Sequence, residues 1–226
     1  MATGLGNGNL SPHIVHNVIL FGEVGSGKSS IVNMIVGREV ALTSNGGGGC
    51  TFQNQSYETT IENTTFRIYD TVGLNQCNQG RVPHSVAEQE LHNLIEQLDG
   101  VSWLIFCNRG MVKENAAANW KLLNKEICLE MVPIIAVVTG LEEEDDPDNW
   151  WRRKENQRVF QKYRLKPLAV GCIVSFLGRR IEYADDYARS QAKVRRFFKA
   201  NHSRQPRNPT QPRGGFWSCL TSRFHE

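Results

Sequence analysis

The residues of this chain with the clearest chemical capacity form one glycine-rich segment, GEVGSGKS at positions 22–29. It matches G-x-x-x-x-G-K-[ST] in full, a loop whose glycines let successive backbone N–H groups point inward at phosphate oxygens. Lys28 is expected to reach the β- and γ-phosphates of a nucleotide, and the Ser29 hydroxyl is expected to ligate Mg²⁺. The predicted phosphate-binding residues are Gly22, Glu23, Val24, Gly25, Ser26, Gly27, Lys28, Ser29 and Ser30.

A second element, Asp70-Thr71-Val72-Gly73, directly follows a strand-like run. In P-loop proteins an acid at a neighbouring strand end holds Mg²⁺, so we assign Asp70 that role through water and Gly73 an N–H bond to the γ-phosphate. Thr51 follows four glycines and is predicted to close over Mg²⁺ when a γ-phosphate is present. The alternative is that Thr51 only begins a strand. The predicted catalytic residues are Lys28, Thr51 and Gly73, and the metal ligands are Ser29, Thr51 and Asp70.

A base-reading site is predicted at Thr139-Gly140-Leu141-Glu142, where an apolar run ends. GTPases place [N/T]-K-x-D here, and its acid accepts hydrogen bonds from guanine. Thr139 fits the first position, Glu142 is one methylene longer than Asp, and Gly140 replaces the lysine whose stem lies along the base. Ser175 is predicted to supply a backbone contact to guanine O6. Two alternatives stay open: a solvated acidic loop, and an ATP-dependent kinase or ATPase.

These segments together resemble a known family over residues 17–200. GEVGSGKSSIVNMIVG, Cys50-Thr51, YDTVGLN, LIFCNRG and VVTGLE are similar to motifs of the avirulence-induced and immunity-associated (GIMAP-like) GTPases of the septin-related class. The resemblance implies a G-domain fold, GTP or GDP with Mg²⁺ as ligands, and regulation by self-association. It also places Arg109 at the arginine of the family's box between the third and fourth motifs.

Two substitutions bear on turnover. The residue after D-x-x-G is Leu74, where Ras-like enzymes carry the glutamine that orients the attacking water. Val24 replaces a loop glycine, and its side chain would crowd an arginine supplied by a partner. We therefore expect slow hydrolysis of GTP to GDP, a nucleotide-controlled switch or scaffold, and a GTP-dependent homodimer. An ordinary metabolic enzyme and a pseudo-GTPase without turnover are the alternatives.

Apolar runs of strand length alternate with amphipathic helical patterns, which predicts a three-layer α/β P-loop fold with a mostly parallel central sheet. Glu62-Asn63 is predicted to be a hairpin turn, Ser85 to open a capping box, and Asp148 or Asn149 to cap a helix. The Trp150-Trp151 pair is expected to pack on the core. Strands are expected at residues 14–21, 56–61, 65–69, 101–107, 132–138 and 168–174, and helices near 28–36, 85–98, 115–129, 148–163 and 182–200.

The predicted organisation is a flexible leader at 1–13, a GTPase domain at 14–200 and a basic, disordered tail at 201–226. The tail holds four arginines against one acid, so the remaining 22 basic and 22 acidic residues balance. A neutral body argues against a nucleic-acid partner. Contact of the tail with a membrane through Phe216, Trp217 and a lipidated Cys219 is the less favoured alternative to disorder.

The six cysteines are scattered, without a Cys-x-x-Cys pair or zinc-ligand spacing. Reduced thiols in a cytoplasmic protein are the expected state. The N-terminal residues lack the cationic and apolar regions of a secretory signal, and residue 2 is Ala, so the myristoylation pattern is absent.

Overall fold

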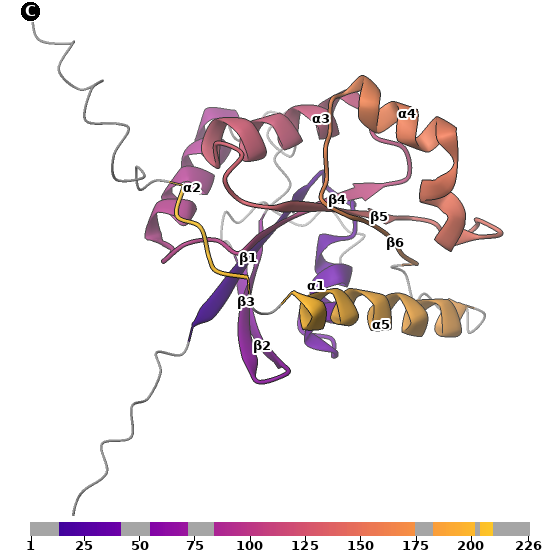
Figure 1. The fold of residues 1–226 in the computed structure, drawn as a ribbon, viewed down its shortest axis with the longest axis horizontal. Helices are drawn as coiled ribbons and strands as arrows, with labels where there is room; N and C mark the ends of the chain where they lie inside the picture. Colours follow the sequence, from indigo (N-terminus) through magenta and orange to yellow (C-terminus); the bar gives the residue numbers. More distant parts are fainter. Residues whose placement is uncertain (1–13, 42–54, 72–83, 175–182, 202–203, 210–226) are drawn as a thin grey trace, which may run out of the picture.

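The computed structural model describes residues 14–41, 55–71, 84–174, 183–201 and 204–209. These residues form a six-stranded sheet in the order β2-β3-β1-β4-β5-β6, with helices on both faces (Figure 1). Four of its strand pairs are parallel, and β2 pairs with β3 in antiparallel fashion. The predicted three-layer, mostly parallel α/β architecture is therefore confirmed.

The elements follow one another in the predicted alternation. The strands are β1 (Val15–Gly22), β2 (Gln55–Ile61), β3 (Thr64–Asp70), β4 (Trp103–Arg109), β5 (Ile134–Thr139) and β6 (Val170–Cys172). The helices are α1 (Lys28–Val36), α2 (His84–Gln97), α3 (Glu114–Trp120), α4 (Lys154–Lys162) and α5 (Ala184–Ala200), with a π-helical segment η2 (Lys121–Ile127) and a 3₁₀ helix η3 (Pro147–Arg152).

The central strand β1 shows why both faces of the sheet are covered. Its residues are apolar without interruption from Val18 to Phe21, and successive side chains of a strand point to opposite faces. Val18 and Leu20 pack in the cluster that includes residues of α1 and α5, whereas Ile19 and Phe21 pack with residues of α2, α3 and α4. A continuous apolar run is thus the signature of a strand buried on both sides.

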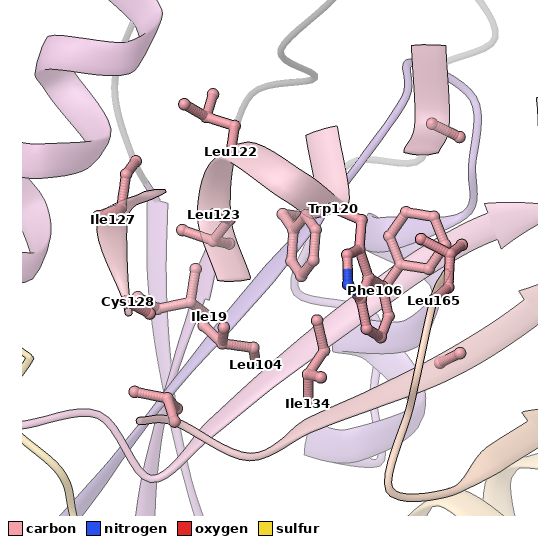
Figure 2. Packing of buried hydrophobic residues seen from close by; sticks show 14 of the residues in the cluster. Ile19, Leu104, Phe106, Trp120, Leu122, Leu123, Ile127, Cys128, Ile134 and Leu165 are labelled. Atoms are coloured by element: carbon pink, nitrogen blue, oxygen red, sulfur yellow. The ribbon is translucent and has the colours of Figure 1, made fainter. Parts of the chain in front are cut away.

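Figure 2 shows the core on the face covered by α3 and η2. The Trp120 ring meets Phe106 of β4 edge to face, with centroids 5.3 Å apart and planes at 87°. Both side chains are fully buried, so each contributes roughly 3 kcal/mol to folding by leaving water. This contact anchors the helical segment formed by α3 and η2 to β4 near the middle of the segment. The strand β4 leads towards the predicted site.

The local structure departs from the sequence prediction in two helices. The single helix predicted at 115–129 is α3 followed by the π-helical η2, whose wider turn brings Leu122, Leu123 and Ile127 all into the core. The predicted caps Asp148 and Asn149 are wrong: Asp146 caps the 3₁₀ helix η3 by accepting the N–H of Asn149, and α4 begins only at Lys154.

Two other local predictions are confirmed. Glu62 and Asn63 both have positive φ, 50° and 62°, as the two-residue turn of a hairpin requires. Trp150 is buried and Trp151 packs against the core, with its ring edge to face on Phe160.

The segment after α5 returns to the sheet. Val101 and Arg207 exchange two backbone hydrogen bonds of 2.7 and 2.8 Å, and the Arg204 guanidinium lies 4.8 Å from the Trp103 ring centroid. Residues 204–209, assigned to the tail by the sequence, therefore contact the start of β4. None of the helices in the described part of the chain has the length and apolar character needed to cross a bilayer.

Candidate nucleotide-binding site

The glycine-rich loop joins the carboxyl end of β1 to the first turn of α1. Gly27 precedes the helix in a left-handed conformation, φ 86°, and no side chain among the described residues caps the first amides of α1. A helix N-terminus without a side-chain cap offers N–H donors and a positive dipole end to an anion. The loop therefore presents the donors that the sequence motif predicts.

The glycines of the loop are required by close approaches. A Cβ at Gly22 would lie 2.1 Å from the carbonyl oxygen of Cys107, and one at Gly27 would lie 3.0 Å from Thr139 Cγ2. Gly25 has a φ of 73°, which only glycine adopts without strain. Cys107 of β4 and Thr139 of β5 therefore lie too close to Gly22 and Gly27 for a side chain at either glycine.

Lys28 lies folded across the loop. Its ammonium donates to the carbonyl oxygens of Gly22 at 3.2 Å and Glu23 at 2.9 Å, and the residue is only 8% exposed. Burial lowers the pKa of Lys28, while the nearby charge of Asp70 acts in the opposite direction. A buried ammonium whose hydrogen bonds to the described residues go to carbonyl oxygens gains strongly from a phosphate that brings negative charge.

Ser29 and Asp70 meet beside this lysine. The Ser29 hydroxyl donates to Asp70 Oδ2 at 2.9 Å, which joins the first turn of α1 to the end of β3. Burial raises the pKa of the Asp70 carboxyl, and the charge of Lys28 and the hydrogen bond from Ser29 lower it. The two predicted Mg²⁺ ligands that the structure describes are therefore together.

The donor set at this point fits Mg²⁺. A hydroxyl and a carboxylate are hard oxygen ligands, and Mg²⁺ takes few protein ligands because it keeps waters and substrate phosphate oxygens. Among the described residues no group of three or more His, Cys, Asp or Glu side chains could hold a metal by itself. Ser26 Oγ is buried without a hydrogen-bond partner in the described part of the chain, and a Cβ at Gly22 would lie 2.9 Å from it.

The predicted base-reading residues lie at the end of β5. Thr139 is fully buried and its hydroxyl donates to the carbonyl oxygen of Ser26 at 2.9 Å, which ties the phosphate loop to this strand. Gly140 follows with φ 75°, and the Glu142 side chain is 10% exposed. Glu142 Oε2 lies 3.8 Å from Arg109 Nη2 of β4. The structure thus places Thr139 against the phosphate loop, and Gly140 and Glu142 beside Arg109.

The acids that follow Glu142 have structural partners. Glu144 pairs with Arg153 at 2.8 Å, and Asp146 caps η3. These contacts account for two of the acids that made a solvated loop the alternative interpretation.

Sequence reasoning missed Asn33 of α1. Its Oδ1 accepts the N–H groups of Val40 and Ala41 at 2.9 and 2.8 Å, and its Nδ2 donates to the carbonyl of Ala41 at 3.0 Å. An asparagine among the apolar residues of the predicted helix was the signal in the sequence that could have indicated a structural role for this side chain. Asn33 fixes the chain as it leaves the α1 region towards residues 42–54.

The structure describes some of the remaining predicted residues and leaves the others outside the described part. Glu23 is half-buried, Val24 is 53% exposed at the loop surface, and Ser30 lies half-buried in the first turn of α1. Thr51, Gly73, Leu74 and Ser175 lie outside the described residues, so their roles stay predictions. The Ser85 capping box also involves side chains outside the described set.

The fold and the phosphate loop define a P-loop GTPase of the G-domain class. The family model described as 50S ribosome-binding GTPase matches residues 17–139, more than half of the chain, and the chain belongs to this family. The match ends at Thr139 and so covers the phosphate-binding part of the site, but not Gly140 or Glu142.

One curated relative is the probable tRNA modification GTPase MnmE of Cyanidium caldarium, 29% identical over 114 residues, which are 50% of this chain and 24% of that protein. The chain thus spans about a quarter of the length of that relative.

Solved G domains share the fold. Toc33 from Arabidopsis thaliana in complex with Mg²⁺ and GMPPNP has a TM-score of 0.56 and 18% identity, covering 84% of this chain and 86% of that chain. Era, in complex with MgGDPNP and nucleotides of 16S ribosomal RNA, has a TM-score of 0.52 and 18% identity, covering 80% of this chain and 56% of that chain.

Proposed function

We propose that this chain binds GTP and GDP with Mg²⁺ and hydrolyses GTP slowly, as a nucleotide-controlled switch or scaffold. The observation that carries the proposal is the Ser29–Asp70 hydrogen bond beside the buried Lys28, at the end of a complete phosphate loop. Membership of a GTPase family supports it, as do the Mg²⁺–nucleotide complexes of Era and Toc33.

The chain's own residues suit charge stabilisation at the γ-phosphate. Loop amides and the N-terminus of α1 bind the phosphates, and Lys28 exchanges its two carbonyl partners for phosphate oxygens. Bound Mg²⁺ supplies positive charge that neutralises those oxygens, and Ser29 and Asp70 would hold it, the latter through water. Thr51 and Gly73 complete the site in this proposal, and a water attacks the phosphorus in line.

Slow turnover follows from two residues. Leu74 cannot hydrogen-bond the attacking water, and the exposed side chain of Val24 stands where an arginine from a partner would approach the loop. Slow hydrolysis suits a switch, because the triphosphate state persists until a partner acts.

Competition between nucleotides tests the proposal. GTP and ATP, each with Mg²⁺, are titrated against a fluorescent guanine nucleotide bound to the full chain, and Lys28→Ala serves as the site control. We expect GTP to compete far better than ATP, and Lys28→Ala to lose triphosphate binding and turnover. A preference for ATP would assign the chain to the ATP-dependent kinases or ATPases. Nucleotide that binds but never turns over would make it a pseudo-GTPase.

We further propose the narrower GIMAP-like, septin-related kinship and a GTP-dependent homodimer. The motif resemblance supports both, and a dimerization-deficient mutant among the solved Toc33 structures supports the second. Sedimentation with GDP and with a non-hydrolysable GTP analogue tests the dimer. We expect assembly only with the analogue, and specific activity that rises with protein concentration. A monomer in both states with concentration-independent turnover would contradict self-activation.

The domain limits 14–200 with a leader and a tail, the cytoplasmic location, and a partner set without nucleic acid are proposals as well. The zero net charge of residues 1–200 supports the last of these. Because Era is bound to ribosomal RNA in its structure, the proposal needs a direct test. Titration with a labelled ribosomal RNA fragment at physiological salt should show no specific binding, and a salt-resistant complex would refute it.

A further inference from the structure

Gly140 occupies the position at which the base-reading motif of GTPases carries a lysine. A Cβ built on Gly140 would lie 2.6 Å from Arg109 Cγ, 3.0 Å from its Nε and 3.2 Å from its Cζ. The shortest of these separations is closer than real Cβ atoms approach their neighbours. The side chain of Arg109 therefore fills the space into which a side chain at position 140 would extend.

The backbone holds Arg109 at this place. Arg109 is the last residue of β4 and pairs in parallel register with Thr139, the last residue of β5. The N–H of Gly110 donates to the carbonyl of Thr139 at 2.9 Å, and Asn108 Nδ2 donates to the carbonyl of Gly110 at 2.7 Å. The position of Arg109 relative to Gly140 is thus set by two strand ends and the turn after β4.

The charges at this edge complement each other. Arg109 Nη2 lies 3.8 Å from Glu142 Oε2, within ion-pair range but beyond a direct hydrogen bond. The Arg109 side chain is 60% exposed, whereas that of Glu142 is 10% exposed. A planar guanidinium stacks on aromatic rings and also forms hydrogen bonds at its rim. Arg109 can therefore contact a ring with its face while it attracts the carboxylate.

We propose that Arg109 replaces, within the same chain, the lysine missing from the base-reading motif. Its stem and guanidinium lie along the face of the guanine ring, and its charge orients Glu142 to accept the N–H groups of that ring. This assignment rests on the proposed guanine-nucleotide binding and makes Arg109 a specificity-determining residue. It explains how a chain with glycine at position 140 keeps a cation beside the base.

The test compares Arg109→Ala, Gly140→Lys and the double variant in the full chain. Affinities for GDP and ADP are measured with Mg²⁺ by competition against a fluorescent nucleotide. We expect Arg109→Ala to weaken GDP about tenfold and ADP less, since the stacking contact serves either purine ring whereas the orientation of Glu142 serves guanine alone. Gly140→Lys should weaken GDP as well, because the introduced side chain meets Arg109 and because a φ of 75° strains a residue that has a side chain. In the double variant the collision with Arg109 is absent but the backbone strain at position 140 remains, so the loss of GDP affinity should be smaller than the sum of the two single losses.

Arg153→Ala is the matched control, because Arg153 pairs with Glu144 of the same loop and is not among the groups nearest to Gly140 in the described part of the chain. Its ratio of GDP to ADP affinity should equal that of the wild type. Thermal unfolding of every variant separates loss of specificity from loss of fold. Arg109→Lys, which keeps the stem and the charge, should retain part of the GDP preference.

The outcomes separate this inference from the proposed function. A wild-type chain that prefers ADP refutes the guanine assignment itself. A wild-type preference for GDP that survives Arg109→Ala unchanged, or a double variant in which the two losses add, overturns the inference alone. A loss of GDP affinity that appears only at protein concentrations where the chain dimerises also overturns it, since Arg109 then acts on a second copy.

Discussion

Ser29 and Asp70, 41 residues apart in sequence, are joined by a hydrogen bond of 2.9 Å from the hydroxyl to Oδ2. In this arrangement the Ser29 hydroxyl donates its hydrogen bond to the carboxylate, and the lone pairs of its oxygen stay available. The same oxygen can therefore face a cation without breaking the contact with Asp70. The two elements whose side chains would hold a divalent ion, α1 and β3, are joined by this hydrogen bond.

Removal of either partner should abolish the response to metal. Ser29→Ala and Asp70→Asn are expected to bind a GTP analogue with nearly the same affinity in Mg²⁺ and in EDTA, because the first lacks the ligand hydroxyl and the second lacks the carboxylate charge that holds the ion through water. The wild type should lose at least about tenfold in affinity when Mg²⁺ is removed. Isothermal titration in both buffers measures the ratio. Ser56→Ala, on the exposed part of β2, is the control, and a wild-type response in Ser29→Ala would contradict the assignment.

Lys28→Met should separate binding from stability. Affinity for triphosphate is expected to fall by more than about 100-fold, because a charge-assisted contact to phosphate is lost. The free energy of unfolding of the nucleotide-free protein should change by less than about 1 kcal/mol, since relief from burying an ammonium offsets the two lost hydrogen bonds. Urea denaturation measures the second quantity. A large destabilisation would show that Lys28 holds the empty loop together.

Asn33→Ala should destabilise the domain through its loop contacts. The substitution leaves the N–H groups of Val40 and Ala41 without their acceptor, at an expected loss of about 1–3 kcal/mol in unfolding free energy. Gln89→Ala on α2 removes a single exposed side-chain hydrogen bond and should change stability by less than about 0.5 kcal/mol. Denaturant midpoints compare the two variants. Equal midpoints would refute the role of Asn33.

Truncation of the aromatic pair in the core should be costly. Trp120→Ala removes a fully buried ring that packs edge to face on Phe106, and we expect a loss of about 3–5 kcal/mol. Leu168→Ala is the counterpart, because Leu168 is 60% exposed and should have little effect. Thermal unfolding of both variants checks the difference. A midpoint for Trp120→Ala close to that of the wild type would mean that the cavity collapses.

The buried thiols should resist alkylation in the folded protein. Burial raises the pKa of Cys128 to about 12, and burial also raises the pKa of Cys107. Only the thiolate reacts, and at pH 8 a group with a pKa of about 12 is ionised in about one molecule in 10⁴. Mass spectrometry of peptides after iodoacetamide treatment should find both cysteines unmodified until denaturant is added. Rapid modification of Cys128 in native buffer would refute this burial.

The strand ends and the phosphate loop were predictable from sequence because their signals are local. The run VILF, the glycines at fixed spacing and the Lys28-Ser29 pair each specify a conformation within a few residues. The structure places all of them where the pattern predicts, and it brings Asp70 to Ser29 because parallel strands end at one edge of the sheet.

The contacts that the sequence did not reveal depend on long-range register. Nothing local indicates that Arg109 covers Gly140, since the contact arises from the pairing of β4 with β5. Asn33 looked like an ordinary helical position, although its side chain binds the loop beyond the helix end. The π-helical turn of η2 was also hidden, because its apolar residues fit an α-helical pattern over so short a stretch.

The two backbone hydrogen bonds between Val101 and Arg207 bear on where a tag for immobilisation should be attached. That bridge precedes β4, at the edge of the sheet opposite to Gly22, where the phosphate loop begins. A fusion partner or biotin tag attached beyond residue 209 therefore starts from the side remote from the nucleotide. A probe attached at residue 209 itself would thus lie away from the nucleotide.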